Sequence, residues 1–165
     1  MKKALTVFIT LSLIALLCCS CGKTKTYIAE ITVENYGVIT VELDAKTAPI
    51  TVANFVKLAN EGFYDGLTFH RIMPNFMIQG GSPNGTSTGG SSETIKGEFS
   101  ANGVKNNISH VRGAISMARS SSYNSASSQF FIVHEDSTFL DGQYAAFGHV
   151  TDGMDVVDAI CENTP

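Results

Sequence analysis

The number and length of the regular segments constrain the fold of this chain most. Only residues 49–62 and 154–161 carry apolar residues at helical spacing. The other regular segments are short runs with alternating or β-branched and aromatic residues, at 28–34, 38–43, 67–72, 76–79, 95–99, 113–118, 129–134 and 145–150. Many short strands with two helices predict a closed or nearly closed antiparallel barrel whose ends the helices cover.

Turn and loop residues separate these runs. Asn35-Tyr36-Gly37 lies between the first two and predicts a β-hairpin. Residues 82–92 are nearly all Gly, Ser, Thr, Asn and Pro, so we expect an ordered loop that borders a groove. Residues 120–128 hold many serines, which predicts a tight excursion between two strands, stabilised by serine hydrogen bonds.

The N-terminus has the layout of a secretory signal. A basic start, Lys2-Lys3, precedes an apolar run, residues 4–17, that is short for a membrane span. Small residues before a cysteine, with Gly22 after it, resemble the lipobox of bacterial lipoproteins, in which the cysteine becomes the lipidated mature N-terminus. We expect lipidation at Cys21; Cys19 is the alternative, and an ordinary cleaved signal peptide stays open. The predicted organisation is therefore a signal peptide (1–20), a short tether (21–26) and one domain (27–165).

Charge and cysteine content narrow the possible partners. Two of the 11 Lys and Arg residues lie in the signal segment, whereas all 15 Asp and Glu residues follow it. This excess of acidic residues disfavours nucleic acid as a partner. It also means that any attachment to a membrane would depend on the lipid and not on a basic surface patch. The domain retains only Cys161, and none of the four histidines stands at metal-ligand spacing, so we expect neither a disulfide framework nor a metal.

The stretch from Phe69 to Gly81 is the part of the sequence that most suggests a functional site. It reads as two short strands joined by a proline-asparagine turn. If the strands pair, Arg71 and Gln79 stand among Phe76, Met77 and other apolar side chains. A permanently charged guanidinium beside an apolar wall is costly unless something uses it. We therefore expect a functional site here, with the glutamine holding the guanidinium by a hydrogen bond.

Other chemistries have little support. No serine stands in a GxSxG elbow, no phosphate-binding GxxxxGK[ST] pattern occurs, and no carboxylate pair suggests general acid–base catalysis. The sequence thus offers an arginine, a glutamine and apolar walls, without an evident nucleophile or base.

Several longer motifs carry a family resemblance. They are APITVANF (48–55), YDGLTFHR (64–71), FMIQGG (76–81), GAISMA (113–118), SSQFFI (127–132) and FLDG (139–142). With these motifs in this order, residues 27–163 resemble the compact bacterial cyclophilin-type peptidyl-prolyl cis–trans isomerases. The resemblance implies a mainly β fold, an eight-stranded antiparallel barrel capped by two α-helices, in agreement with the segment pattern.

The resemblance also implies a site. Arg71 and Gln79 would be catalytic. The pocket for the proline ring would be formed by Phe76, Met77, Phe131 and Leu140. The path of the peptide would be lined by Ala118, Arg119 and Gln129, and the rim would be formed by Phe139 and Tyr144. The expected enzyme is a monomer without cofactor that acts on proline-containing segments of unfolded or flexible exported proteins. It would be lipid-anchored on the extracytoplasmic side of the membrane, or in the periplasm if the host has two membranes.

Some positions depart from the family pattern. Phe139 stands where eukaryotic members often carry Trp, Tyr144 where many carry His, and Tyr123 where bacterial relatives usually have Pro. The first two suggest weaker binding of cyclosporin-type ligands. The sequence stops at Pro165, where the family normally continues into a last strand, so two alternatives stay open: the sequence is truncated, or the barrel lacks its closing strand. Two other functions stay open: a non-catalytic chaperone or scaffold that binds proline-containing peptides on the same fold, and a surface adhesin that uses the Ser/Gly loops.

Overall fold

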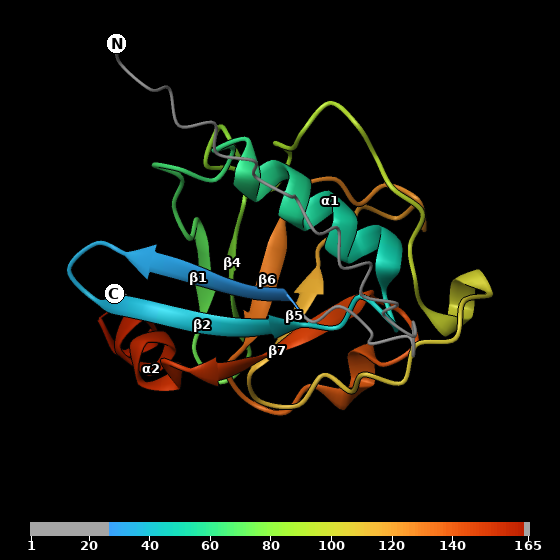
Figure 1. Ribbon diagram of the computed structural model, residues 1–165. Coiled ribbons are helices and arrows are strands. Elements are labelled where there is room, and N and C mark those ends of the chain that lie inside the picture. Colours follow the sequence, from blue (N-terminus) through green and yellow to red (C-terminus); the bar gives the residue numbers. More distant parts are fainter. Residues whose placement is uncertain (1–26, 164–165) are drawn as a thin grey trace, which may run out of the picture.

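A single curled antiparallel sheet with two helices makes up residues 27–163, the part that the computed structural model describes (Figure 1). The elements are β1 (Tyr27–Val33), β2 (Gly37–Leu43), α1 (Pro49–Asn60), β3 (Arg71–Met73), β4 (Met77–Gly80), β5 (Ala114–Met117), β6 (Phe130–Val133), β7 (Ala146–Asp152) and α2 (Met154–Glu162), with short 3-10 turns η1 (Ser100–Asn102) and η2 (Thr138–Leu140). The strand order is β1-β2-β7-β5-β6-β4-β3. The predicted mainly β class with two helices is confirmed.

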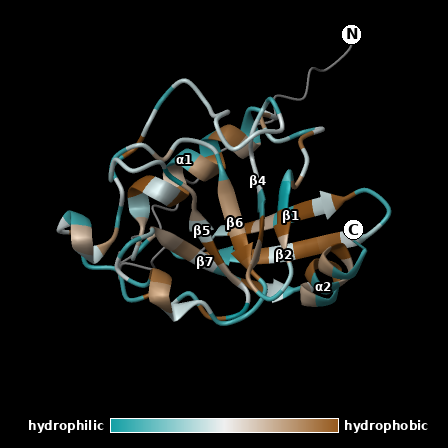
Figure 2. Cartoon of the chain, turned by 180° about the vertical axis from the view of Figure 1, so that it is seen from behind, coloured by the Kyte–Doolittle hydropathy of each residue, from teal (hydrophilic) through white to brown (hydrophobic). Residues whose placement is uncertain are grey.

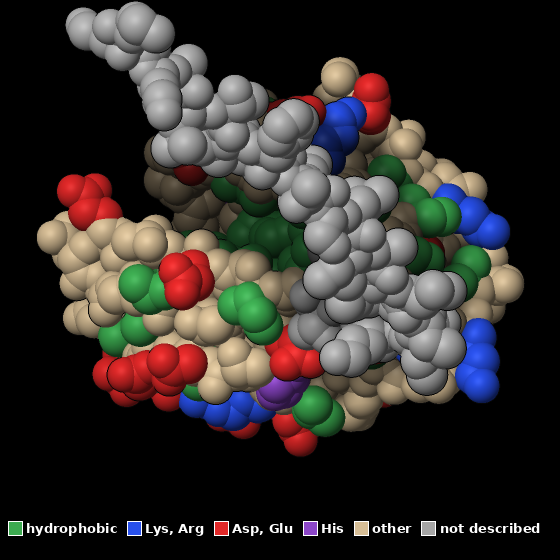
Figure 3. Space-filling model, in the orientation of Figure 1, with side chains coloured by type: hydrophobic (Ala, Val, Ile, Leu, Met, Phe, Trp, Pro, Cys, Tyr) green, Lys and Arg blue, Asp and Glu red, His purple; other side chains and the backbone are tan. Residues whose placement is uncertain are grey.

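The sheet curls without closing. Within the described residues it has seven strands, with β1 and β3 at its two edges. The inner-facing residues of β1 are only partly buried against the core, among them Ala29 and Ile31. Figure 3 shows hydrophobic side chains in the hollow between the β1–β2 hairpin and α1. The observed architecture is therefore a half-barrel.

Alternation along the central strands creates two hydrophobic clusters. Ile78, Ile115 and Ile132 face inward and are fully buried in the main core. Their neighbours face the opposite side of the sheet and form a second cluster, made of the buried residues Met77, Ala114, Phe131 and Val133. Figure 2 shows the central strands as largely hydrophobic and the surrounding loops as mostly polar. Because successive side chains of a strand point to opposite faces, one sheet supplies both the core and an outer apolar wall.

The two helices lie at different ends of the sheet (Figure 1). Phe55 of α1 contacts the rings of Tyr64, Phe130 and Phe147, with centroid separations of 5.1, 5.4 and 5.4 Å. Helix α2 buries Val157 and Ile160 in the same core. None of the described helices has the combination of length and apolarity that crossing a bilayer requires.

Residues 95–99 do not form the predicted strand. Only an isolated bridge joins Ile95 to Ala126, and Glu98 turns inward to the start of α1. Its carboxylate accepts hydrogen bonds from the backbone N–H groups of Ile50 (3.1 Å) and Thr51 (2.7 Å) and from the Thr51 hydroxyl (2.7 Å). The N-cap position is Ala48, which offers no side-chain acceptor, so the distant carboxylate satisfies the free donors of the first turn.

Replacing this buried carboxylate is expected to destabilise the fold. In Glu98→Gln the amide lacks the charge and one acceptor oxygen, so we expect the free energy of unfolding to fall by about 2 kcal/mol. Urea unfolding followed by circular dichroism measures the change. The control is Glu93→Gln, whose exposed carboxylate pairs with Lys57 at 3.2 Å, and which should change stability by less than about 1 kcal/mol. Equal losses in both variants would contradict the capping role.

Candidate active site

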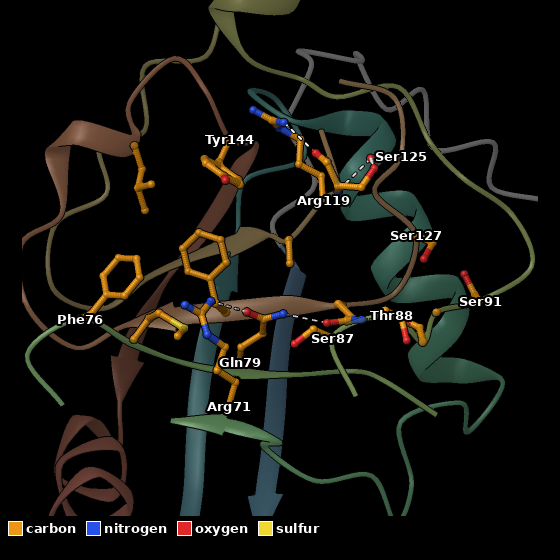
Figure 4. Close-up of a pocket in the computed structure, with 18 residues that line it drawn as sticks. Arg71, Phe76, Gln79, Ser87, Thr88, Ser91, Arg119, Ser125, Ser127 and Tyr144 are labelled. Carbon is orange, nitrogen blue, oxygen red and sulfur yellow. Dashed lines mark hydrogen bonds between the residues drawn. The ribbon is translucent and has the colours of Figure 1, made fainter. Parts of the chain in front are cut away.

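A groove of about 690 Å³ lies on the outer face of β3, β4, β6 and β5 (Figure 4). Its lining is apolar at one end, with Phe76 and Tyr144, and polar at the other, with Ser87, Thr88 and Ser91. Arg71 and Gln79 lie between the two ends. The same strand alternation that builds the second hydrophobic cluster brings these side chains to one surface.

A chain of hydrogen bonds orients Arg71. Arg71 and Gln79 are cross-strand partners, and Arg71 Nη1 donates to Gln79 Oε1 at 3.3 Å, as predicted. Gln79 Nε2 donates to Gln129 Oε1 at 2.7 Å. Gln129 Nε2 in turn donates to the backbone carbonyls of Thr86 and Gly89. Both glutamines are nearly buried, so the exposed guanidinium is tied through them to the loop of residues 82–92.

The apolar end contains every residue expected in the proline pocket. Met77 and Phe131 are buried members of the second hydrophobic cluster, while Phe76 and Leu140 pack against it partly exposed. Ala118, expected in the peptide path, packs against the same cluster. The floor and walls of this pocket therefore come from β4, β6 and η2, together with the residue before β4 and the residue after β5.

The two predicted rim residues occupy different positions. Tyr144 lines the groove and contacts Phe131 edge to face, with ring centroids 6.0 Å apart. Phe139 is 71% exposed and lies outside the groove lining. Its ring stacks on Phe76 at 5.8 Å, so it extends the apolar surface beyond the pocket.

Arg119 is held by the protein itself. Its Nε and Nη2 donate to the carbonyl of Gln143 at 3.0 and 2.9 Å, and its Nη1 donates to that of Ser120 at 2.9 Å. The guanidinium also lies 4.6 Å from the Tyr144 ring centroid and 5.1 Å from that of Tyr123. Arg119, which the resemblance assigns to the peptide path, lines the groove. Its hydrogen bonds and ring contacts fix it between residues 120–128 and the rim residue Tyr144.

The polar end includes residues that the sequence did not single out. Ser87, Thr88, Ser91, Ser120, Ser125 and Ser127 line it. Residues 82–92 were expected to border a groove, but loop composition does not tell which hydroxyls face it. Within residues 120–128 the expected serine hydrogen bonds occur, because Ser125 Oγ accepts from Ser120 N at 3.0 Å and donates to Ser122 O at 2.6 Å. Within residues 27–163, no cluster of three or more His, Cys, Asp or Glu side chains is placed to hold a metal ion.

Two histidines near the groove have depressed pKa values. Burial lowers the pKa of His110 below its usual 6.5, although the hydrogen bond to Asp141 opposes this. Burial also lowers the pKa of His70, and the charge of Arg71 lowers it further. Both histidines are therefore held neutral in the folded protein at a pH where they are partly protonated in the unfolded chain.

This difference predicts acid-sensitive stability. Below pH 6.5 the unfolded chain binds more protons at these two positions than the folded chain, so the free energy of unfolding falls as the pH falls. The slope is at most about 1.4 kcal/mol per pH unit for each proton. Urea unfolding at pH 7.5, 6.5 and 5.5 measures it. A stability that rises on acidification over this range would contradict the prediction.

Comparison with known proteins agrees with this geometry. Residues 28–164 match the family model described as cyclophilin type peptidyl-prolyl cis-trans isomerase/CLD. The chain is 54% identical over 114 residues to peptidyl-prolyl cis-trans isomerase B of Bacillus subtilis, covering 69% of this chain and 76% of the relative. It is 47% identical over 128 residues to a peptidyl-prolyl cis-trans isomerase of Helicobacter pylori, covering 76% of each.

A solved structure shares the fold. The Cryptosporidium parvum cyclophilin type isomerase, crystallised in the presence of the dipeptide Ala-Pro, superposes with a TM-score of 0.76 at 33% identity, covering 84% of this chain and 87% of that one. The fold and groove thus define a cyclophilin-like β protein. The chain belongs to the cyclophilin-type peptidyl-prolyl cis–trans isomerase family, and its enzymatic class is that of a peptidyl-prolyl cis–trans isomerase.

Proposed function

We propose that this isomerase accelerates X–Pro bond rotation in exported proteins, with Arg71 as the catalytic residue. The observation that carries the assignment of Arg71 is its position on one face of the sheet beside the second hydrophobic cluster. An apolar pocket suits a proline ring, and an adjacent fixed cation suits the nitrogen of the same residue.

The chemistry follows from the physics of the amide bond. Rotation about an X–Pro bond breaks C–N conjugation against a barrier of roughly 18–20 kcal/mol. In the twisted transition state the lone pair of the prolyl nitrogen is localised and becomes a hydrogen-bond acceptor. A guanidinium that donates to this nitrogen binds the transition state better than the planar ground state and thereby lowers the barrier.

The contacts of Arg71 fit this role. Nη1 donates to Gln79 at 3.3 Å and Nη2 contacts the sulfur of Met73 at 2.9 Å. These contacts orient the guanidinium while leaving it further N–H groups for a substrate. The neighbouring Phe76 and Met77 exclude water, which strengthens the interaction of the cation with the prolyl nitrogen. A module that only binds peptides would use the apolar pocket and would not need an oriented guanidinium.

The proposed setting depends on the N-terminal segment, which lies outside the described residues. Its basic, apolar and small-residue order supports export, and the Ser20-Cys21-Gly22 sequence supports lipidation at Cys21. A single lipid chain gives marginal membrane binding, so stable anchoring needs a second chain or a basic patch. Because the mature chain is acidic, we propose a multiply acylated N-terminal cysteine that holds the domain on the extracytoplasmic side of the membrane.

Metabolic labelling with a radioactive fatty acid tests this setting. The full chain, expressed in a bacterium, should incorporate the label and fractionate with membranes. Cys21→Ser should lose both properties, whereas Cys19→Ser should keep them. Loss of label only in Cys19→Ser would move the anchor to that cysteine, and an unlabelled parent would contradict a lipid anchor.

A further inference from the structure

His110 is a fully buried histidine on the inner side of the proline pocket. Its Nδ1 lies 2.8 Å from Asp141 Oδ1 and its Nε2 lies 2.9 Å from Ser116 Oγ. Its ring lies nearly parallel to that of Phe131, at an interplanar angle of 18° and a centroid separation of 6.0 Å. The mechanism above uses none of these atoms, so this arrangement needs another explanation.

The order Asp141, His110, Ser116 has the hydrogen bonds of a hydrolytic triad but not its exposure. Ser116 is fully buried and sits in the middle of β5, where its backbone pairs with Phe131. A nucleophile must reach a substrate carbonyl, and this hydroxyl cannot. The three side chains therefore act on the protein rather than on a substrate.

These hydrogen bonds join the elements that form two walls of the pocket. Asp141 directly follows Leu140, and it also accepts the backbone N–H of His110 at 2.8 Å and the Ser109 hydroxyl at 2.6 Å. The carbonyl of His110 accepts the N–H of Ser137 at 2.7 Å, which fixes the other end of η2. One residue thus holds both ends of the segment that carries Leu140 and also supports the ring of Phe131.

We propose that His110 is a positioning residue that fixes the Phe131 and Leu140 walls of the proline pocket. This inference rests on the proposed use of that pocket for proline. The pocket holds the proline ring in both the ground state and the transition state, because the ring itself does not twist. Loosening the walls should therefore weaken substrate binding and leave the chemical step nearly unchanged, which appears as a higher KM at constant kcat.

Two substitutions separate the two contacts. His110→Asn keeps a donor toward Asp141 and removes the ring beside Phe131. Asp141→Ala removes the side-chain link to the C-terminal end of η2, at a partly exposed side chain, and leaves His110 in place. The control is His149→Gln, at an exposed histidine of β7 outside the groove lining.

The readouts are the affinity for the dipeptide Ala-Pro, from NMR titration, and KM and kcat for an Ala-Pro-containing peptide. We expect the Kd for Ala-Pro and the KM for the peptide both to rise, about tenfold in His110→Asn and about threefold in Asp141→Ala. The kcat should stay within about twofold of that of the parent. The control should match the parent throughout.

Unchanged affinity in a folded His110→Asn protein, or a fall in kcat without a change in KM, would overturn the inference. If His110→Asn shows no cooperative unfolding transition, Asp141→Ala decides, and unchanged affinity in that variant overturns the inference as well. A parent that neither binds Ala-Pro nor isomerises the peptide would instead overturn the proposed function, and this inference with it.

Discussion

Arg71→Ala is expected to lower kcat/KM about 100-fold, with most of the loss in kcat, because it removes the donor that favours the twisted amide. Arg71→Lys should recover only part of the loss. Lysine keeps the charge but loses the planar fork that lets Arg71 bind Gln79 while it presents other N–H groups to a substrate. Stopped-flow measurement of cis-to-trans conversion in an X–Pro peptide gives both constants.

The control for charge is Lys105→Ala, since Lys105 is an exposed cation outside the groove lining. It should keep the activity of the parent. Because Arg71 is itself exposed, its removal should leave the unfolding transition nearly unchanged. A folded Arg71→Ala protein with parental kcat would remove Arg71 from the mechanism.

Gly81→Ala is expected to produce the largest loss of stability among these substitutions. Gly81 follows β4 with φ of +84°, a conformation that disfavours any side chain. An added Cβ would overlap the carbonyl oxygen of Ser128 and lie 3.1 Å from Gln129 Cα. Both neighbours are backbone and cannot rotate away, so we expect the free energy of unfolding to fall by more than about 3 kcal/mol.

Gly85→Ala is the matched control. Gly85 also has a positive φ, +65°, but its added Cβ meets nothing within 4 Å. Only the backbone cost of about 1–2 kcal/mol should appear. Urea unfolding of both variants separates the cost of the steric overlap from the cost of a positive φ in a residue with a side chain. Equal losses would show that the strands beside Ser128 can move apart at little cost, which would contradict a rigid groove.

The sequence predicted correctly those elements that are determined by residues close together in the chain. The hairpin at Asn35-Tyr36-Gly37, the helix that begins at Pro49 and the pairing of Arg71 with Gln79 all occur as expected. Each of these features follows from turn chemistry or from periodicity over a few residues. Phe131 and Leu140 became predictable as pocket residues only through the family resemblance, because they lie far from Phe76 in the sequence.

Long-range contacts explain what the sequence did not predict. Residues 95–99 look like a strand, yet Glu98 bonds to α1 across 48 residues and thereby replaces strand pairing. Nothing in the spacing of His110, Ser116 and Asp141 indicates that they meet, because β5 and η2 bring them together only in the folded chain. The contacts of Arg119 with the rings of Tyr123 and Tyr144 also cannot be predicted from a single sequence.

The most direct test of the account is to add the purified full chain to a peptide whose X–Pro bond is relaxing from cis to trans. Uncatalysed exchange takes tens to hundreds of seconds, so acceleration is easily resolved. We expect conversion to speed up in proportion to the protein concentration, and to lose that acceleration in Arg71→Ala. A folded protein that binds Ala-Pro but leaves the relaxation rate unchanged would contradict the account and identify the groove as a peptide-binding site without catalysis.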